Sequence, residues 1–307
     1  MTGRFAPPAL MKFGPSIIAA LAAAVSFAFA AVLQQESTQS VSEDKSLSVG
    51  LLTELLRRRQ WLAGGACMLA GFGLQALALA YGPVALVQPI VVTELAFAIP
   101  FGILRRHRRA GRREWAGIAC VMVGVSVFLL AASPGSGIQE PDGESWLASL
   151  IPVGAAALVA VIVGATRKGP RRAMFLGAAA GLSFGVLSVL TKAVTHLLST
   201  DVARAFVTWQ VYAAIGVGIA ALVVSQSAYQ AGPLAYSMPF VGVLEPLVAV
   251  VIGDTVLGEQ VRLSPGLFAS EMLAAAIACS GIMLLTTSPM VLSIYEERRP
   301  IEGSLAI

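Results

Sequence analysis

The sequence contains nine apolar stretches, each long enough to cross a bilayer as a helix. A crossing helix needs about 20 mostly apolar residues. Only 12% of the residues are charged, about half the share of a soluble domain, so polar side chains cannot cover a globule. No stretch alternates as barrel strands do, and open sheets cannot span lipid. The sequence therefore predicts an all-α integral membrane protein with about nine transmembrane helices, at approximately 13–33, 61–81, 84–104, 115–132, 147–165, 173–198, 205–226, 233–252 and 266–287.

Arginine-rich turns predict the orientation. With the N-terminus outside, the segments on the inner side hold 16 Lys and Arg residues and those on the outer side hold 4. The positive-inside rule therefore places the N-terminus outside and the C-terminus in the cytoplasm, in a plasma (inner) membrane. Lys12 and "AFA" at 28–30 also fit a secretory signal, but cleavage would put the arginine runs on the wrong side. We expect the first helix to be retained.

The same distribution argues against several classes of partner. Basic residues cluster in short turns between apolar segments, so we expect the bilayer as partner and no nucleic acid. Cys67, Cys120 and Cys279 lie inside apolar segments without metal-type spacing and are expected to serve packing. "GFGLQA" at 71–76 lacks the preceding strand of a dinucleotide site, so no cofactor is expected.

An internal repeat relates the two halves of the chain. "GPVALVQPIV" from residue 82 and "GPLAYSMPFV" from residue 232 share five of ten positions, and "SF" recurs in helices one and six. Helices one to four thus resemble helices six to nine. The single helix between them inverts the second copy, a plan that recurs in secondary transporters. The expected parts are an outer tail 1–12, a first repeat 13–132, a loop and connector helix 133–172, an inverted repeat 173–287 and a cytoplasmic tail 288–307.

Two carboxylates lie within predicted spans. Glu94 is the eleventh of 21 residues in "VALVQPIVVTELAFAIPFGIL", and Glu245 follows 151 residues later. An acidic residue at a helix centre costs about 2.5–3.5 kcal/mol, so both are expected to line a polar pathway that binds a cation or carries coupling protons. Alternatively, each is protonated or hydrogen-bonded and only locks helix packing. Because the repeat offset is otherwise 150, the extra residue turns Glu245 by about 100°.

Both carboxylates can face one cavity only if the backbone is distorted, and three prolines within the helices are candidates for that kink: Pro89, Pro239 and Pro246. Lys192, toward the outer end of helix six, either reaches the membrane surface or serves as a counter-charge or substrate contact. Neutral polar residues are further candidates for the pathway, although such groups also link membrane helices: Gln75, Gln88, Thr93, Tyr236 and Gln226.

Several segments resemble known transporter families. "LEPLVAVVIGDTVLGE" at 244–259 and the following "AAAIACSGIMLL" resemble the closing motif of EamA-type members of the drug/metabolite transporter superfamily. "LALAYGPVALVQPI" at 77–90 and "GLSFGVLSVLTKAV" at 181–194 are more similar to the NIPA-type magnesium transporter branch, with Pro89 and Lys192 at matching positions. Glu94 and Glu245 depart from the NIPA pattern, whereas Glu245 with Pro246 matches the EamA pattern.

These observations favour a secondary transporter of a small solute, working by alternating access and most similar to metabolite or drug exporters. A magnesium transporter with Glu94 and Glu245 as metal ligands is the alternative, because magnesium prefers oxygen ligands. A non-transporting accessory or lipid-handling protein is a third hypothesis. An enzyme is not expected, since only two histidines are present and one lies in a basic turn. Association into a homo-oligomer stays open.

Overall fold

The computed structural model describes residues 13–41, 45–105, 107–132, 143–200, 202–258 and 265–296. The predicted outer tail 1–12 and the end of the cytoplasmic tail, 297–307, lie outside these residues. Regular structure in the described part is helical. The helices are α2 (Gly14–Thr38), α3 (Val49–Leu55), α4 (Arg59–Tyr81), α5 (Val84–Val91), α6 (Glu94–Leu104), α7 (Arg112–Ala132), α8 (Gly143–Ala165), α9 (Gly169–Thr200), α10 (Val202–Val207), α11 (Trp209–Ala231), α12 (Leu234–Leu257), α13 (Pro265–Thr286) and α14 (Pro289–Glu296).

The prediction of an all-α membrane protein is confirmed. Seven helical segments of the described part are long and apolar enough to cross a membrane: α2, α4, residues 86–104, α8, α9, α11 and α12. Two further predicted spans coincide with α7 and α13, which pack against each other. Many Leu and Ile side chains on the outward faces are exposed, with Leu69 of α4 at 74%. Such faces need an apolar solvent, so the chain is a multi-pass membrane protein.

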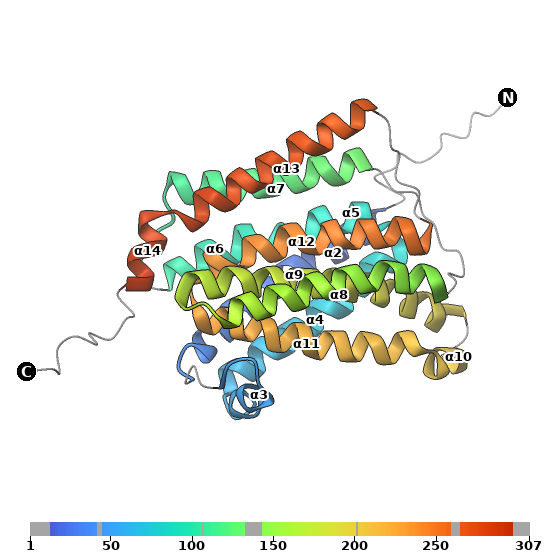
Figure 1. Cartoon of the computed structure of the whole chain (residues 1–307), viewed down its shortest axis with the longest axis horizontal. Coiled ribbons are helices and arrows are strands. Elements are labelled where there is room, and N and C mark those ends of the chain that lie inside the picture. Colours follow the sequence, from blue (N-terminus) through green and yellow to red (C-terminus); the bar gives the residue numbers. More distant parts are fainter. Residues whose placement is uncertain are drawn as a thin grey trace, which may run out of the picture.

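Helix contacts form a regular pattern. α2 packs along α4 in the first half, and α9 packs along α11 in the second. α2 also contacts α5 and α6, as α9 contacts α12. Figure 1 shows α7 and α13 side by side along the upper edge of the bundle, with α8, α9 and α12 below them. α8 packs on α9 and α12 and is otherwise peripheral.

Three glycines bring α9 and α12 into close contact. A Cβ atom on Gly177, Gly181 or Gly185 would lie within 3.0 Å of backbone atoms of α12. These glycines recur at every fourth residue and therefore share one helix face. Lipid tails are as apolar as the side chains, so close packing of small residues stabilises such a contact. The α9–α12 interface thus fixes the position of the middle of α12.

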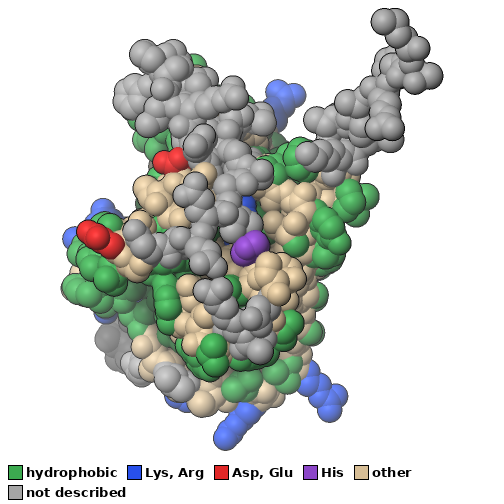
Figure 2. Space-filling model, turned by 90° about the vertical axis from the view of Figure 1, so that its right-hand side faces the viewer, with side chains coloured by type: hydrophobic (Ala, Val, Ile, Leu, Met, Phe, Trp, Pro, Cys, Tyr) green, Lys and Arg blue, Asp and Glu red, His purple; other side chains and the backbone are tan. Residues whose placement is uncertain are grey.

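The arginine-rich turns lie at one end of the bundle, which we call the basic end. Figure 1 places α3, α14 and the turns joining α6 to α7 and α8 to α9 at its left side. Among the described residues, these turns and the start of α4 contain Arg57–Arg59, Arg105, Arg108, Arg109, Arg112, Arg113, Arg167, Lys168, Arg171 and Arg172. Figure 2 views the opposite end, where few charged side chains are visible among those described.

Three short helices were not predicted. α3 lies in the stretch 34–60, which was expected to be a loop, and α10 precedes α11. α14 occupies the start of the expected tail 288–307. α3 forms because Leu51 and Leu55 bury completely in a small cluster with Val41 and Trp61. The segment that contains α3 is therefore attached to the bundle.

Candidate functional site

A small cavity lies among α2, α4, α6, α9, α11 and α12. Its volume is about 40 Å³, and one water molecule needs about 10–15 Å³ on the same measure. It therefore holds a few water molecules and is far smaller than a site for a drug-sized ligand, at about 300–1,000 Å³. Its polar lining residues are Gln34, Glu94, Tyr229 and Glu245, and its apolar lining residues are Phe27, Ala30, Ala31, Met68, Phe72, Phe184, Met238 and Val241.

Glu94 reaches this cavity through a break in the third predicted span. α5 ends at Val91 and α6 begins at Glu94, so the predicted helix is interrupted at its middle. Around the break the hydrogen bonds run from Thr93 N–H to the Ile90 carbonyl and from Leu95 N–H to the Val92 carbonyl, at 3.0 and 3.1 Å. These bonds span three residues and tighten the chain into a 3₁₀-type turn. Glu94 is 8% exposed.

Glu245 approaches the cavity from the opposite repeat and is held by hydrogen bonds. The Ser188 hydroxyl of α9 donates to Glu245 Oε1 at 3.2 Å, and Gln75 Nε2 of α4 donates to the same oxygen at 3.5 Å. Gln75 Nε2 also lies 3.4 Å from Ser188 Oγ. α12 continues unbroken through both of its prolines, Pro239 and Pro246. The expected distortion therefore lies in the first repeat, three residues after Pro89.

The carboxyl groups of Glu94 and Glu245 lie near enough to interact electrostatically. The Tyr229 hydroxyl also lies near enough to interact with each of these two carboxyl groups. Two negative charges in one small apolar space repel each other. Repulsion of this kind is relieved when one carboxyl binds a proton or when a cation lies between the two. No cluster of three or more His, Cys, Asp or Glu side chains exists among the described residues, so any metal would have at most these two carboxylates in the cavity.

A chain of buried polar side chains connects the cavity to the basic end. The Trp61 indole N–H donates to Gln226 Oε1 at 3.0 Å, and Gln226 Nε2 donates to Gln34 Oε1 at 2.6 Å. Gln34 lines the cavity, and its own amide nitrogen lies 3.7 Å from Met68 Sδ. The chain links α4, α11 and α2. Gln226 thus joins two other helices beside the cavity.

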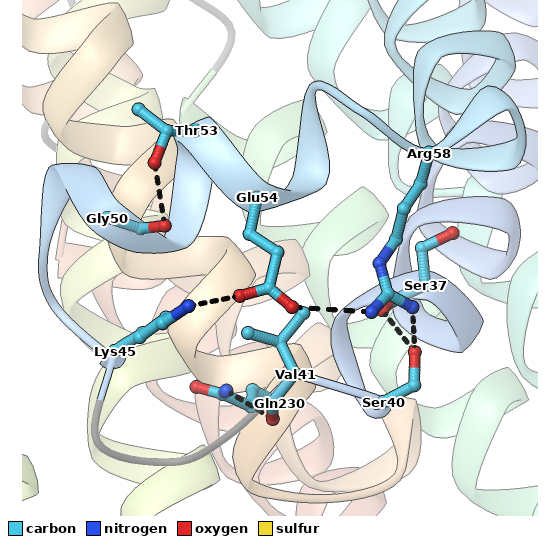
Figure 3. A network of polar contacts seen from close by, with 9 residues as sticks. All are labelled: Ser37, Ser40, Val41, Lys45, Gly50, Thr53, Glu54, Arg58 and Gln230. Carbon is cyan, nitrogen blue, oxygen red and sulfur yellow. Dashed lines mark hydrogen bonds and ion pairs between the residues drawn. The ribbon is translucent and has the colours of Figure 1, made fainter.

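The α3 segment covers the same end. Figure 3 shows Glu54 between Lys45, at 2.5 Å, and Arg58, at 3.5 Å. The Lys45 hydrogen bond, aided by the positive charges of Lys45 and Arg58, lowers the pKa of the exposed Glu54 carboxyl. Gln230 Nε2 of α11 donates to the Val41 carbonyl at 2.9 Å, which ties the segment to the bundle. The α3 segment is therefore fixed to the bundle at the basic end.

Some predicted pathway residues lie elsewhere. Lys192 is 6% exposed and does not line the cavity. The Thr93 hydroxyl donates to the Ile90 carbonyl at 2.6 Å and supports the helix break. Gln88 and Tyr236 are almost fully buried but also lie outside the lining. The Gln88 amide has no hydrogen-bond partner among the described residues.

Other lining residues were not predicted. Gln34, Tyr229 and the Glu245 partner Ser188 lie in predicted spans but were not singled out. The dipeptide "SF", which recurs in the first and sixth predicted helices, could have indicated the site, because its phenylalanines, Phe27 and Phe184, both line the cavity. The two recurring "SF" pairs thus meet at this site.

Comparison with known proteins gives little functional information. No protein-family model matches the chain, and no solved structure matches it. An uncharacterized protein of Corynebacterium glutamicum is 28% identical over 275 residues, which cover 86% of this chain and 94% of that protein. The similarity therefore covers most of both chains.

Proposed function

We propose that this protein is a secondary-active transporter of a small solute, coupled to protons, that works by alternating access between two inverted four-helix repeats. The observation that carries the proposal is the pair Glu94 and Glu245, which come from the two halves, one residue out of register, and line one small cavity. Intramembrane carboxylates that face an internal cavity are typical of proton and ion pathways.

The helix bounds support the inverted repeat. α4 and α11 each have 23 residues, and their bounds differ by 150 positions, as do the starts of α5 and α12. The matching contacts of α2 with α4 and of α9 with α11 agree with this relation. α8, the single helix between the copies, reverses the second copy. On this proposal nine spans place the basic end in the cytoplasm of the plasma (inner) membrane.

The cavity size favours protons as the coupling ion. Magnesium retains several of its waters when bound, and a space of about 40 Å³ cannot hold such a hydrated ion. A proton on either carboxyl needs no added volume. We therefore propose a metabolite or drug exporter of the drug/metabolite transporter superfamily, in a closed state, and retain the NIPA-like magnesium transporter as the alternative to be tested.

Cysteine accessibility tests alternating access without a known substrate. Ala30 lines the cavity, whereas Ala20 lies on the same helix and is completely buried elsewhere. In a background without the three native cysteines, Ala30→Cys should react with a small membrane-impermeant thiol reagent from either side of the membrane, and Ala20→Cys should not. If Ala30→Cys reacted from only one side of the membrane, or from neither, the proposal would be refuted.

Flux measurements separate the two substrates. In proteoliposomes, a proton gradient should drive solute accumulation, tested with a panel of small metabolites and drugs. Glu245→Gln resembles a permanently protonated carboxyl, so it should lose this accumulation yet retain solute exchange. The exposed Glu144→Gln is the control. Magnesium tracer uptake that is lost in Glu245→Gln but independent of the proton gradient would replace the proton proposal with the cation alternative.

A further inference from the structure

A second, much larger space lies on the side of the bundle between α4 and α11. This lateral groove has a volume of about 680 Å³, and its lining is almost entirely apolar. Leu62 and Leu69 of α4 and Ile215 and Ile219 of α11 line it and are 45–74% exposed. Both helices are candidate membrane spans with most of their surface outward. The groove therefore opens toward the acyl chains of the bilayer.

The groove extends along half of a bilayer. On α4 its lining runs from Trp61, two residues after the start of the helix, to Phe72 near the middle. Eleven residues of helix rise about 16 Å, close to the half-thickness of a hydrocarbon core of about 30 Å. One leaflet's acyl chain thus has the length to fill it. Gln34, Met68 and Phe72 line both the groove and the carboxylate cavity, so they form the wall between the two.

Three arginines follow the basic end of the groove in the chain. Leu56 lines its basic end, and Arg57, Arg58 and Arg59 follow directly in the chain. Arg58 binds Glu54. The side chains of Arg57 and Arg59 are exposed and make no hydrogen bond or ion pair in the part of the chain that the structure describes. Arg59 also precedes Leu62 by three residues and so lies on the groove-facing side of α4.

We infer that the lateral groove is a binding site for an anionic phospholipid of the leaflet at the basic end. One acyl chain fills the groove between α4 and α11, and the phosphate binds Arg57 and Arg59. The apolar lining selects the hydrocarbon chain, and the arginines select the charge of the headgroup. The lipid chain then contacts Met68 and Phe72, on the outer side of the cavity wall.

Two glycines in the groove allow a direct test. A Cβ atom on Gly65 meets no atom within 4 Å, and one on Gly218 meets only the Leu187 side chain at ordinary contact distance. Leucine at either position therefore fills the groove without disturbing the helix packing. Gly73 of α4 and Gly216 of α11 have equally open surroundings but lie outside the groove, so Gly73→Leu and Gly216→Leu are matched controls.

The measurement is a titration of the delipidated protein in detergent with phosphatidylglycerol or phosphatidylcholine of identical acyl chains, followed by native mass spectrometry. An arginine beside an anionic headgroup contributes about fivefold in affinity. Arg57→Gln with Arg59→Gln should therefore weaken phosphatidylglycerol binding by roughly thirtyfold and leave phosphatidylcholine binding nearly unchanged. Gly65→Leu and Gly218→Leu should weaken both lipids, whereas their controls should not.

Three outcomes would overturn the inference. Equal affinity of the wild-type protein for both lipids would remove the role of the arginines. Identical lipid binding by Gly65→Leu, Gly218→Leu and their controls would remove the groove. A shift from dimer to monomer in both groove variants, without a change in bound lipid, would assign the groove to a second copy of this chain.

Discussion

Gly185→Ala tests the close contact that places Glu245. A Cβ atom at residue 185 would lie 2.6 Å from Val248 Cβ and 2.7 Å from the Glu245 carbonyl oxygen, where ordinary contacts begin at 3.4 Å. Neither neighbour is the flexible end of a side chain. α9 and α12 must therefore separate by about 0.7 Å, and such overpacking typically costs about 1–3 kcal/mol of unfolding free energy.

The same displacement affects the carboxylate. The Ser188 hydroxyl donates to Glu245 Oε1 at 3.2 Å, and an added 0.7 Å would take this bond beyond the usual limit of roughly 3.5 Å. Gly185→Ala should therefore lose both stability and the gradient-driven flux proposed above. The flux loss would resemble that of Glu245→Gln.

The control substitution, Gly216→Ala, should change the unfolding free energy in the opposite direction. Gly216 is exposed on α11, and a Cβ atom there meets nothing within 4 Å. Gly216→Ala should be neutral or stabilising by up to about 1 kcal/mol, because alanine is the better helix former. Reversible unfolding in mixed micelles with increasing dodecyl sulfate, followed by tryptophan fluorescence, measures both variants. Equal midpoints for the two would show that α9 and α12 are not in backbone contact at residue 185.

Two further predictions concern the basic end. Trp61→Phe removes the donor to Gln226 Oε1, so it should cost about 1–3 kcal/mol of unfolding free energy. It should also speed labelling of Ala30→Cys from the basic end. Unchanged labelling would show that this hydrogen bond does not limit access to the cavity. The pKa of the Glu54 carboxyl is lowered, chiefly by Lys45. The ion pairs of Glu54 should therefore stabilise the α3 segment at pH values above the ordinary carboxyl pKa of about 4.3. This stabilisation should be lost as the pH falls through the lowered pKa. Amide exchange across 45–58, corrected for its intrinsic pH dependence, should rise below about pH 4 in the wild type and show no such step in Glu54→Gln.

The helical spans were predictable because their physical requirement is simple. A bilayer demands long apolar segments with every backbone group paired, and the chain supplies them between arginine-rich or Gly-Pro turns. The turn at Gly82-Pro83 separates α4 from α5, and Gly232-Pro233 separates α11 from α12. These turns, which lie 150 residues apart, therefore indicated the helix ends.

The residues around the carboxylates were harder to predict. Gln34 and Ser188 line or support the site, whereas Gln88 and Tyr236 are similar in polarity and lie outside the lining. Composition cannot separate these cases, because the choice depends on helix rotation. One signal was available: "GAAAGLSFG" at 177–185 has glycine at every fourth residue, which predicts a close helix contact on that face. Ser188 lies one turn further along.

The break in the third span also reduces the effect of the one-residue offset between the two carboxylates. Glu94 is ten residues after the start of α5, whereas Glu245 is eleven residues after the start of α12. Eleven α-helical steps turn about 1,100° and rise about 16.5 Å. With the three steps from Val91 to Glu94 in the 3₁₀ geometry of the tight turn, the segment turns about 1,060° and rises about 16.5 Å. The tightened turn thus restores the depth and more than half of the rotation that one further α-helical residue would have given, which helps two carboxylates out of register by one position to line the same cavity.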